Sequence, residues 1–374
     1  MSRTARIAGW TALGLAALPL GIAIVNLRLL RRPLPAIGRP RISVLIPARD
    51  EAANIADAVA CVLANNDVDL ELLVLDDGST DATPQILNAI PDPRLRVIMG
   101  GGVLPAGWSG KQYACARLGI EARHDLLVFV DADVRLAPDA LSRLAGYMDQ
   151  NPDVGLASGV PRQITLGWSE WLLLPLIHFL LLGYRPIWLD RNRTEPGFAA
   201  GCGQLFIARR AAYAAIGGHH AVRASLHDGI TLPRAFRRGG FQTGLFDATA
   251  IASCRMYGSA RDLWDGLGKN ATEGMATPRA LPIWTVLLAG GHVLPLLLVA
   301  CARTGPASAA LGCGLVLRLM LAMRFRQNLV GAMLHPLGVG LLLIRQWSAL
   351  AGARAGKPAR WRGRTYAAGG ETPP

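Results

Sequence analysis

The sequence places acidic residues directly after apolar runs, although Asp is a poor strand residue and is costly to bury unpaired. Asp131 and Asp133 end one such run, LLVFVDAD at 126–133. Residues i and i+2 of a strand point to the same side, so we expect the two carboxylates to approach one shared partner. Like charges that close repel unless a proton or a cation lies between them.

Short β-rich runs alternate with helical runs after residue 40. The expected strands are 41–47, 70–77, 94–100 and 126–133, and the expected helices are 52–66, 81–90, 110–123 and 137–149. This alternation predicts an α/β fold with a parallel sheet covered by helices on both faces. Asp50 and Glu51 follow the first strand, and Asp76 and Asp77 end the second. The acids therefore gather at the carboxyl edge of the sheet, where open α/β sheets bind ligands.

Several classes of nucleotide and nucleic-acid binding do not fit the sequence. The first β–α turn, PARDEAAN, has no dinucleotide-type glycines, no G-x-x-x-x-G-K-[ST] occurs, and GCG at 201–203 does not open a β–α–β unit. The net charge of +13 lies mostly beside apolar runs, which indicates anionic lipid headgroups and no nucleic-acid partner. What remains is a hard divalent cation on oxygen ligands that holds the phosphates of a nucleotide-linked substrate.

Apolar residues, 51% of the chain, concentrate near both ends. The run 11–30 is followed by arginines, which indicates a retained anchor with the next segment in the cytoplasm. The run 281–302 is long enough to span a membrane, 306–323 and 329–344 are marginal, and the number of C-terminal spans stays open. A helix over 171–183 is expected at the membrane interface or, alternatively, in a protein core. Six cysteines without C-x-x-C spacing indicate buried reduced thiols.

Three segments resemble the nucleotide-sugar half of a family 2 glycosyltransferase: IPARDEAANI (46–55), VLDDGSTDAT (74–83) and FVDADV (129–134). LPAGWSGKQYACARLG (104–119) is similar to the membrane subgroup with carotenoid- and hopanoid-associated enzymes, and the similarity continues to the closing WRGRTY (361–366). The resemblance implies a GT-A nucleotide-sugar-binding domain with a mostly parallel sheet, plus N- and C-terminal transmembrane helices. The expected domains are an anchor and basic linker (1–40), a glycosyltransferase domain (41–278, with halves 41–135 and 136–278), a transmembrane region (279–346) and a basic tail (347–374).

The resemblance also implies roles for individual residues. Asp133 would ligate Mg²⁺ or Mn²⁺ on the donor diphosphate, and Asp131 would contact the ribose or the metal. The remaining implied substrate-binding residues are Pro47, Ala48, Arg49 and Glu51 around the nucleoside, Asp76 or Asp77 at the base, and Trp108. Lys111 stands in the Gly-rich GWSGK turn at a helix start, where its ammonium and nearby backbone N–H groups suit a phosphate. A solvent-exposed lysine is the alternative there.

Inverting transfer needs a general base that deprotonates the acceptor hydroxyl as it attacks the anomeric carbon. The family places this Asp at the front of a helix, in a Glu-Asp pair. The matching segment here is LHDGITLPRAFRRGG (226–240), which makes Asp228 the base. His227 stands where Glu is usual, and its role stays open. The Q-x-x-R-W motif of processive members does not occur in the sequence, so we expect a single sugar transfer.

These features together predict a membrane-bound inverting glycosyltransferase. The expected donor is a nucleotide-sugar, first a UDP-sugar, and the expected acceptor is a lipid such as a carotenoid or another isoprenoid. The domain would face the cytoplasm from a bacterial inner membrane, in contact with membrane lipids. Two alternatives are a polyprenyl-phosphate sugar synthase, whose acceptor is already anionic, and a non-catalytic nucleotide-sugar-binding membrane protein.

Overall fold

The structure is a computed structural model that describes residues 3–101, 103–189, 195–302, 305–361 and 364–366. The chain forms two compact units. The sheet unit comprises Leu30–Arg162, Leu189–Arg255 and Pro358–Pro374, and the helical unit comprises Met1–Leu29, Gln163–Trp188 and Met256–Lys357. Part of the predicted basic tail, 362–363 and 367–374, lies outside the described residues.

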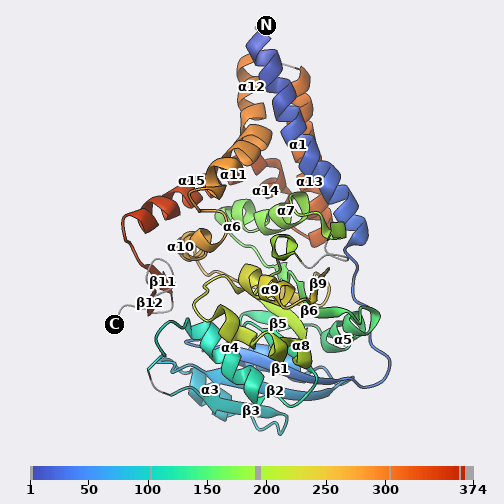
Figure 1. Cartoon of the computed structure of the whole chain (residues 1–374), viewed down its shortest axis with the longest axis vertical. Coiled ribbons are helices and arrows are strands. Elements are labelled where there is room, and N and C mark those ends of the chain that lie inside the picture. The colour runs from blue at the N-terminus through green and yellow to red at the C-terminus, as the bar shows by residue number, and fades with distance from the viewer. Residues whose placement is uncertain (1–2, 102, 190–194, 303–304, 362–363, 367–374) are drawn as a thin grey trace. The chain divides into compact units, whose positions relative to one another are not determined.

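The sheet unit is built on a seven-stranded sheet in the order β3-β2-β1-β4-β8-β6-β9 (Figure 1). Its strands are β1 (Arg41–Ala48), β2 (Asp69–Asp76), β3 (Leu95–Met99), β4 (Leu126–Val130), β6 (Val154–Gly159), β8 (Leu205–Arg209) and β9 (Gln242–Phe246). β8 is antiparallel to β4 and β6, whereas β1 is parallel to β2 and β4. The predicted α/β architecture with a mostly parallel sheet is therefore confirmed.

Helices pack against the sheet, whose strands direct successive side chains to opposite faces. The helices of this unit are α2 (Ile55–Leu63), α3 (Thr83–Asn88), α4 (Gly110–Glu121), α5 (Ala140–Gln150), α8 (Arg210–Ala215) and α9 (Asp228–Arg238), with 3-10 turns η2 (Pro196–Phe198) and η3 (Gly218–Val222). Leu45, Leu73 and Phe129 share one core with Leu118 of α4 and Phe236 of α9. Apolar residues one position along these strands point to the opposite face, because the strand period is two.

A three-stranded sheet and a two-stranded sheet complete the sheet unit. β5 (Val134–Leu136) pairs with β10 (Ala252–Cys254), so the segment that follows Asp133 is held in a second sheet. β11 (Ala359–Trp361) pairs with β12 (Arg364–Tyr366) near the C-terminus. The chain passes from the sheet unit to the helical unit at β7 (Arg162–Gln163).

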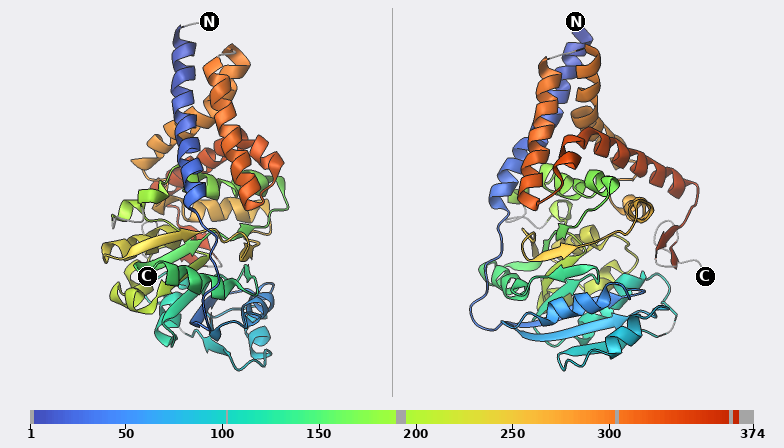
Figure 2. Two further views of the ribbon diagram at one scale, coloured as in Figure 1. Left: turned by 90° about the vertical axis from the view of Figure 1, so that its right-hand side faces the viewer. Right: turned by 180° about the vertical axis from the view of Figure 1, so that it is seen from behind.

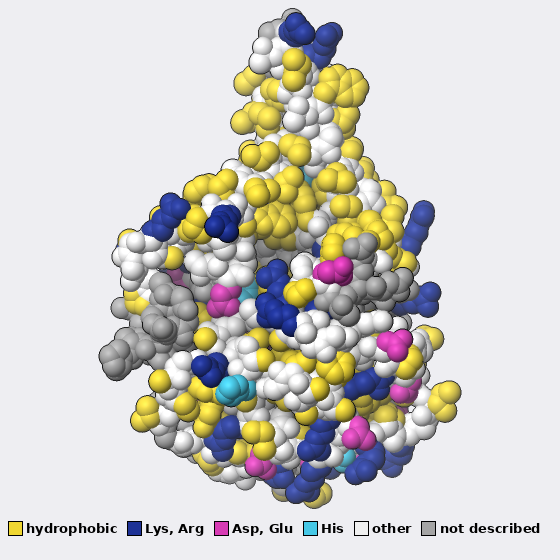
Figure 3. Space-filling view, in the orientation of Figure 1, with side chains coloured by type: hydrophobic (Ala, Val, Ile, Leu, Met, Phe, Trp, Pro, Cys, Tyr) yellow, Lys and Arg dark blue, Asp and Glu magenta, His cyan; other side chains and the backbone are white. Residues whose placement is uncertain are grey.

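The helical unit contains three helices long and apolar enough to cross a membrane: Arg3–Leu29, Ala280–Cys301 and Gly305–Phe325. They correspond to α1 (Arg3–Leu29), to α11 (Ala280–Leu288), η5 (Ala289–Val293) and α12 (Leu294–Ala302) in succession, and to α13 (Gly305–Phe325). α1 lies beside α13 (Figure 2). Hydrophobic side chains cover much of the outer surface of these helices, among them Trp10, Ile283 and Leu297 (Figure 3). The predicted apolar terminal helices are thus present.

The other helices of this unit are short or carry charges. They are α6 (Trp168–Leu173), α7 (Leu176–Gly183), α10 (Ala260–Lys269), α14 (Leu329–Met333) and α15 (His335–Arg354), with η1 (Ile187–Leu189) and η4 (Ala271–Glu273). The predicted apolar helix over 171–183 is present within Trp168–Gly183, where Pro175 interrupts the helical hydrogen bonding between α6 and α7. The cysteines are all free, as predicted, but only Cys115, Cys202 and Cys254 are buried; Cys61 and Cys313 are half-buried and Cys301 is exposed.

Candidate active site

The ends of β1 and β2 bring the predicted nucleoside residues to one edge of the sheet. Pro47 and Ala48 pair in register with Leu75 and Asp76. Asp76 is buried, and its carboxylate accepts hydrogen bonds from the Ser79 hydroxyl and from the Ser79 N–H at 3.3 Å. The sequence predicts the nucleoside at this edge, where hydrogen bonds from Ser79 fix the Asp76 carboxylate.

The loops after β1 and β2 are tied to each other by side-chain caps. Asp50 adopts a left-handed backbone conformation (φ 52°), and its Oδ1 accepts the Thr80 N–H at 2.7 Å. Arg49 Nη1 donates to the Asp77 carbonyl at 2.5 Å. Glu51 Oε2 accepts from the Asn54 side chain at 2.9 Å. Three of the predicted residues, Arg49, Glu51 and Asp77, therefore lie in one pair of loops connected by hydrogen bonds.

The Asp-Ala-Asp triplet lies in a turn and not in a strand, which corrects the expected strand over 126–133. β4 ends at Val130, and the Val134 N–H donates to the Asp131 carbonyl at 3.0 Å, which closes the turn. The two carboxylates do not share one partner through strand alternation. Asp131 contacts Lys111, whereas Oδ1 of Asp133 is buried without a hydrogen-bond partner among the described residues.

Lys111 joins three segments that are distant in the sequence. Its Nζ lies 2.6 Å from Asp131 Oδ1 and 2.9 Å from Asp228 Oδ2, and it donates to the Gly203 carbonyl at 3.0 Å. Burial lowers the pKa of Lys111, but the two carboxylates outweigh burial and raise that pKa well above its usual value. The exposed-lysine alternative is therefore wrong, because this ammonium is the shared counter-ion of two acids.

Asp228 begins α9, where its Oδ1 accepts the Gly229 N–H at 2.9 Å. Burial by itself would raise the pKa of Asp228, but the charge and hydrogen bond of Lys111 dominate together and lower it. His227 acts in the same direction as Lys111 through its charge. With Lys111 in place, Asp228 is an ionised but weak base.

Asp133 has the opposite electrostatic environment. Burial raises the pKa of Asp133 to about 7, and the charges of Asp131 and Glu51 act in the same direction. The described residues contain no group of three or more His, Cys, Asp or Glu side chains arranged to hold a metal. A hard cation here would need further oxygen ligands, and a buried carboxylate oxygen without a partner is the chemistry such a cation prefers.

Gly203, in the GCG segment set aside above, and Gly229, which was not singled out from the sequence, are part of this cluster. A Cβ at Gly203 would collide with the Asp228 carboxylate, and a Cβ at Gly229 would lie 2.9 Å from the Gly201 carbonyl. The Gly201 N–H also donates to the Gly229 carbonyl at 2.7 Å. Glycine at these positions thus allows the backbone of 201–203 to approach the backbone at Gly229 closely. The glycine after Asp228 was the available signal, but pairing it with GCG required the fold.

Three hydrogen bonds connect the start of α4 to the segment before Asp228. Ser109 caps α4, its N–H donates to the Arg223 carbonyl at 2.7 Å, and its hydroxyl donates to the Ser225 carbonyl at 3.0 Å. Gln112 Nε2 donates to the same Ser225 carbonyl at 3.2 Å. These contacts fix Lys111 and Asp228 relative to each other, and neither Ser109 nor Gln112 was singled out from the sequence.

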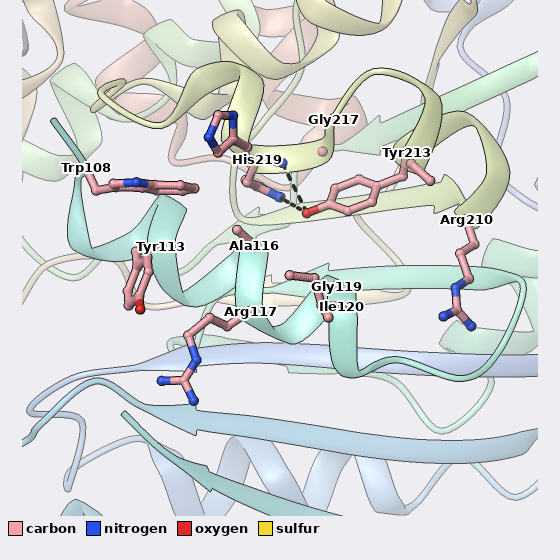
Figure 4. A pocket seen from close by; sticks show the side chains of 13 residues that line it. Trp108, Tyr113, Ala116, Arg117, Gly119, Ile120, Arg210, Tyr213, Gly217 and His219 are labelled. Atoms are coloured by element: carbon pink, nitrogen blue, oxygen red, sulfur yellow. Dashed lines mark hydrogen bonds between the residues drawn. The ribbon is translucent and has the colours of Figure 1, made fainter. Parts of the chain in front are cut away.

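Trp108 lies at a pocket of about 380 Å³ on the outer side of α4. Its ring packs edge-on against Tyr113 and His220, at centroid distances of 5.4 and 5.3 Å. Across the pocket, the Tyr213 hydroxyl pairs with Nδ1 of His219 at 2.8 Å (Figure 4). Burial lowers the pKa of His219 to about 3, so this ring is neutral at pH 7. The predicted substrate contact of Trp108 stays a prediction.

Residues 43–217, which span β1 to the end of α8 and include the acidic edge, Lys111 and Gly203, match the family described as Glycosyl transferase family 2. The chain carries a family 2 glycosyltransferase domain. This domain confirms the predicted resemblance, whereas the family match ends before Asp228.

Proteins similar to this chain are also named as glycosyltransferases. The 4,4'-diaponeurosporenoate glycosyltransferase of Staphylococcus aureus is 25% identical over 236 residues, which cover 62% of this chain. The match spans 61% of that relative's own length. A solved structure of a mannosyltransferase from Pyrobaculum calidifontis, in complex with GDP-Man and Mn²⁺, has a TM-score of 0.55 at 18% identity, and the likeness covers 92% of this chain and 99% of that chain. The glycosyltransferase domain therefore has the predicted GT-A fold.

Proposed function

We propose that this protein is a membrane-bound inverting glycosyltransferase that moves one sugar from a nucleotide-sugar, first a UDP-sugar, to a lipid acceptor. The observation that carries the proposal is the Lys111 ammonium between Asp131 and Asp228 at the carboxyl edge of the sheet. This arrangement supports a phosphate-binding role for Lys111 and a role as general base for Asp228, its neighbour. The S. aureus relative acts on 4,4'-diaponeurosporenoate, and this supports a carotenoid or another isoprenoid as the acceptor.

In this proposal residues 41–278 form the catalytic domain, and residues 1–40 and 279–346 anchor the protein in a bacterial inner membrane. The arginines after α1 support a domain that faces the cytoplasm. Lipid acceptors dissolve in the bilayer, so an enzyme anchored there meets them without extracting them into water. The tail 347–374 adds positive charge for anionic headgroups.

The bond changes follow from the charges at the site. The acceptor oxygen forms a bond to the anomeric carbon, and the bond from that carbon to the diphosphate oxygen breaks with its electron pair. The acceptor proton passes to Asp228. Lys111 neutralises the diphosphate, and its withdrawal from Asp228 removes the interaction that lowers the pKa of that carboxyl. Donor binding thereby makes Asp228 a stronger base.

Asp133, with its unpartnered Oδ1, and Asp131 would hold Mg²⁺ or Mn²⁺ together with the donor diphosphate. A bound divalent cation supplies charge stabilisation for the departing nucleoside diphosphate. The remaining predicted residues have binding roles. The connected loops of Arg49, Glu51 and Asp77, with Pro47, Ala48 and Asp76 at their base, would position the nucleoside.

The test is transfer by the detergent-purified protein with a panel of nucleotide-sugars and a host lipid extract, with and without EDTA. We expect a new glycolipid and free nucleoside diphosphate in the presence of metal. Both should be lost in Asp133→Ala and kept in Asp153→Ala, a matched change of an exposed acid in the same unit. Donor binding without product in any extract would overturn the proposal and leave a nucleotide-sugar-binding protein.

A further inference from the structure

The helical unit contains a buried polar cluster in which five nitrogen atoms, of Arg318, His292 and His335, have no hydrogen-bond partner among the described residues. We call it the Arg318 cluster, and its members are Tyr184, His178, His292, Arg318, Gln327 and His335. Arg318 of α13 is 0% exposed. Its Nη1 donates to Gln327 Oε1 at 3.2 Å, but its Nε and Nη2 have no partner within the described part of the chain. An arginine stays protonated and offers five N–H donors, so a buried positive charge is left uncompensated.

The histidines around Arg318 share this deficit. Neither ring nitrogen of His335 has a partner among the described side chains and backbone, nor does Nδ1 of His292. Arg318 interacts electrostatically with both rings. Gly314, one turn before Arg318 on α13, would place a Cβ 3.2 Å from His292 Nδ1, so a glycine leaves room beside that nitrogen. The His292 and His335 ring centroids lie 4.9 Å apart, and both rings are within the electrostatic range of Arg318, so the three side chains are neighbours in the bundle.

The helices that carry Arg318, His292 and His335 contain no acid, and Glu170 of α6, a buried acid of the same unit, accepts the Leu166 and Gly167 N–H groups. From Ala280 to Arg354 the sequence contains no Asp or Glu, and α1 contains none. A polar residue of the same unit shows what full pairing looks like. Asn26, also buried, donates to the Leu182 and Arg185 carbonyls at 2.7 and 2.6 Å and accepts the Ile187 N–H at 3.0 Å. The helical unit can therefore provide hydrogen-bond partners for both polar atoms of a buried side chain without a ligand.

The backbone adds a second irregularity at the same place. His292 lies in η5, a π-helical turn between α11 and α12, and this turn directs its ring into the unit, where Nε2 pairs with the Tyr184 hydroxyl at 3.0 Å. Such π-bulges occur frequently at functional sites. Ionisable groups inside membrane helices are costly and generally serve a ligand or an ion.

We propose that the Arg318 cluster binds the oxyanion head group, carboxylate or phosphate, of an amphiphile whose apolar chain lies among the membrane helices. The guanidinium fork matches carboxylate and phosphate oxygens with two parallel hydrogen bonds. The Nε and Nη2 edge of Arg318 is the unpaired one, and neutral imidazole N–H groups of His292 and His335 supply further donors. This inference concerns binding and is independent of the proposed transfer reaction.

The test is thermal unfolding of the full-length protein in an uncharged detergent with oleate, oleyl phosphate or oleyl alcohol, which share one apolar chain. A ligand that binds the native state raises the melting temperature. We expect one or both oxyanions, and not the alcohol, to raise it by several degrees. A shift with oleate identifies a carboxylate ligand, and a shift with oleyl phosphate alone identifies a lipid phosphate.

Variants locate the effect. Arg318→Met keeps an unbranched apolar stem but removes the guanidinium, and it should abolish the shift; His335→Phe should reduce it. Arg354→Met, which removes an exposed cation of the same unit, should keep it. An equal shift in Arg318→Met would overturn the proposal. So would the absence of any difference between the oxyanions and oleyl alcohol in the wild type, a comparison that needs no variant to fold; ordered water would then satisfy the guanidinium.

Discussion

Lys111 is a half-buried cation and Arg318 a fully buried one, and their surroundings differ in charge. Lys111, 34% exposed, has two carboxylates and a carbonyl within 3.0 Å. Arg318, 0% exposed, has one amide oxygen at 3.2 Å, and two of its nitrogens are unpaired within the described residues. The sheet unit therefore supplies carboxylate counter-ions to its cation without a ligand. The helical unit supplies none to Arg318 among the described residues, and the proposed oxyanion would provide that counter-ion.

The largest expected effect tests whether Asp228, beside Lys111, is the general base. Asp228→Asn should lower transfer to a hydroxyl-bearing isoprenoid by about 10²- to 10⁴-fold, the usual contribution of general base catalysis. Donor binding should persist, because Asp131, Asp133 and Lys111 remain. The measurement is initial rate together with donor affinity, with Asp153→Ala as control.

The same variant reports the chemistry of the acceptor. A carboxylate or a phosphate acceptor is already ionised at neutral pH and needs no base. An unchanged rate with a hydroxyl acceptor would refute the base role of Asp228. An unchanged rate confined to acidic acceptors would identify the acceptor as an anion, as for the polyprenyl-phosphate alternative.

A smaller change to the backbone should also disrupt the Lys111 cluster. Gly203→Ala puts a methyl group against the Asp228 carboxylate, which must then move away from Lys111. We expect transfer to fall at least about tenfold, equivalent to one lost charged hydrogen bond. Gly197→Ala is the matched control, because a Cβ there meets no atom within 4 Å. Equal rates for both variants would show that close approach at Gly203 is unimportant.

The two cations predict stability changes that differ in direction. Lys111→Met leaves two acids without their counter-ion and should destabilise the fold by about 1 to 3 kcal/mol. Arg318→Met replaces an uncompensated buried charge by an apolar group, a kind of change that is often neutral or stabilising by about 1–4 kcal/mol. Thermal unfolding in ligand-free detergent measures both. Marked destabilisation by Arg318→Met would show that the cluster is already paired in the resting protein.

The smallest expected effect concerns pH. An unfolded histidine titrates near pH 6.5, whereas burial holds the pKa of His219 at about 3. Between these values the unfolded state binds a proton that the native state does not, so stability falls as the pH is lowered from 6.5. His219→Gln should reduce this fall by up to about 1.4 kcal/mol per pH unit. Melting temperatures at pH 7 and pH 5 measure it, and identical pH dependence in both proteins would contradict it.

Much of the sheet unit was predictable because its signals are local. Apolar runs with flanking helical patterns located β1 to β4 and α2 to α5 to within a few residues, and strand ends located the acids around Asp76 and Asp131. The triplet itself was misread as strand, because Val134 to Leu136 continue the β-like pattern although they belong to the second sheet. Periodicity detects an element but not the sheet that it joins.

The sequence by itself determined the family, the acidic edge and the apolar helices, since each depends on residues adjacent in the chain. Only the tertiary structure decided that residues 111, 131, 203 and 228 meet at one ammonium, and that Arg318 meets two histidines without an acid. Those groups come from elements far apart in sequence, and the energy of a charge depends on what surrounds it in space. A lysine and an arginine that look alike in the chain thereby acquire opposite electrostatic roles.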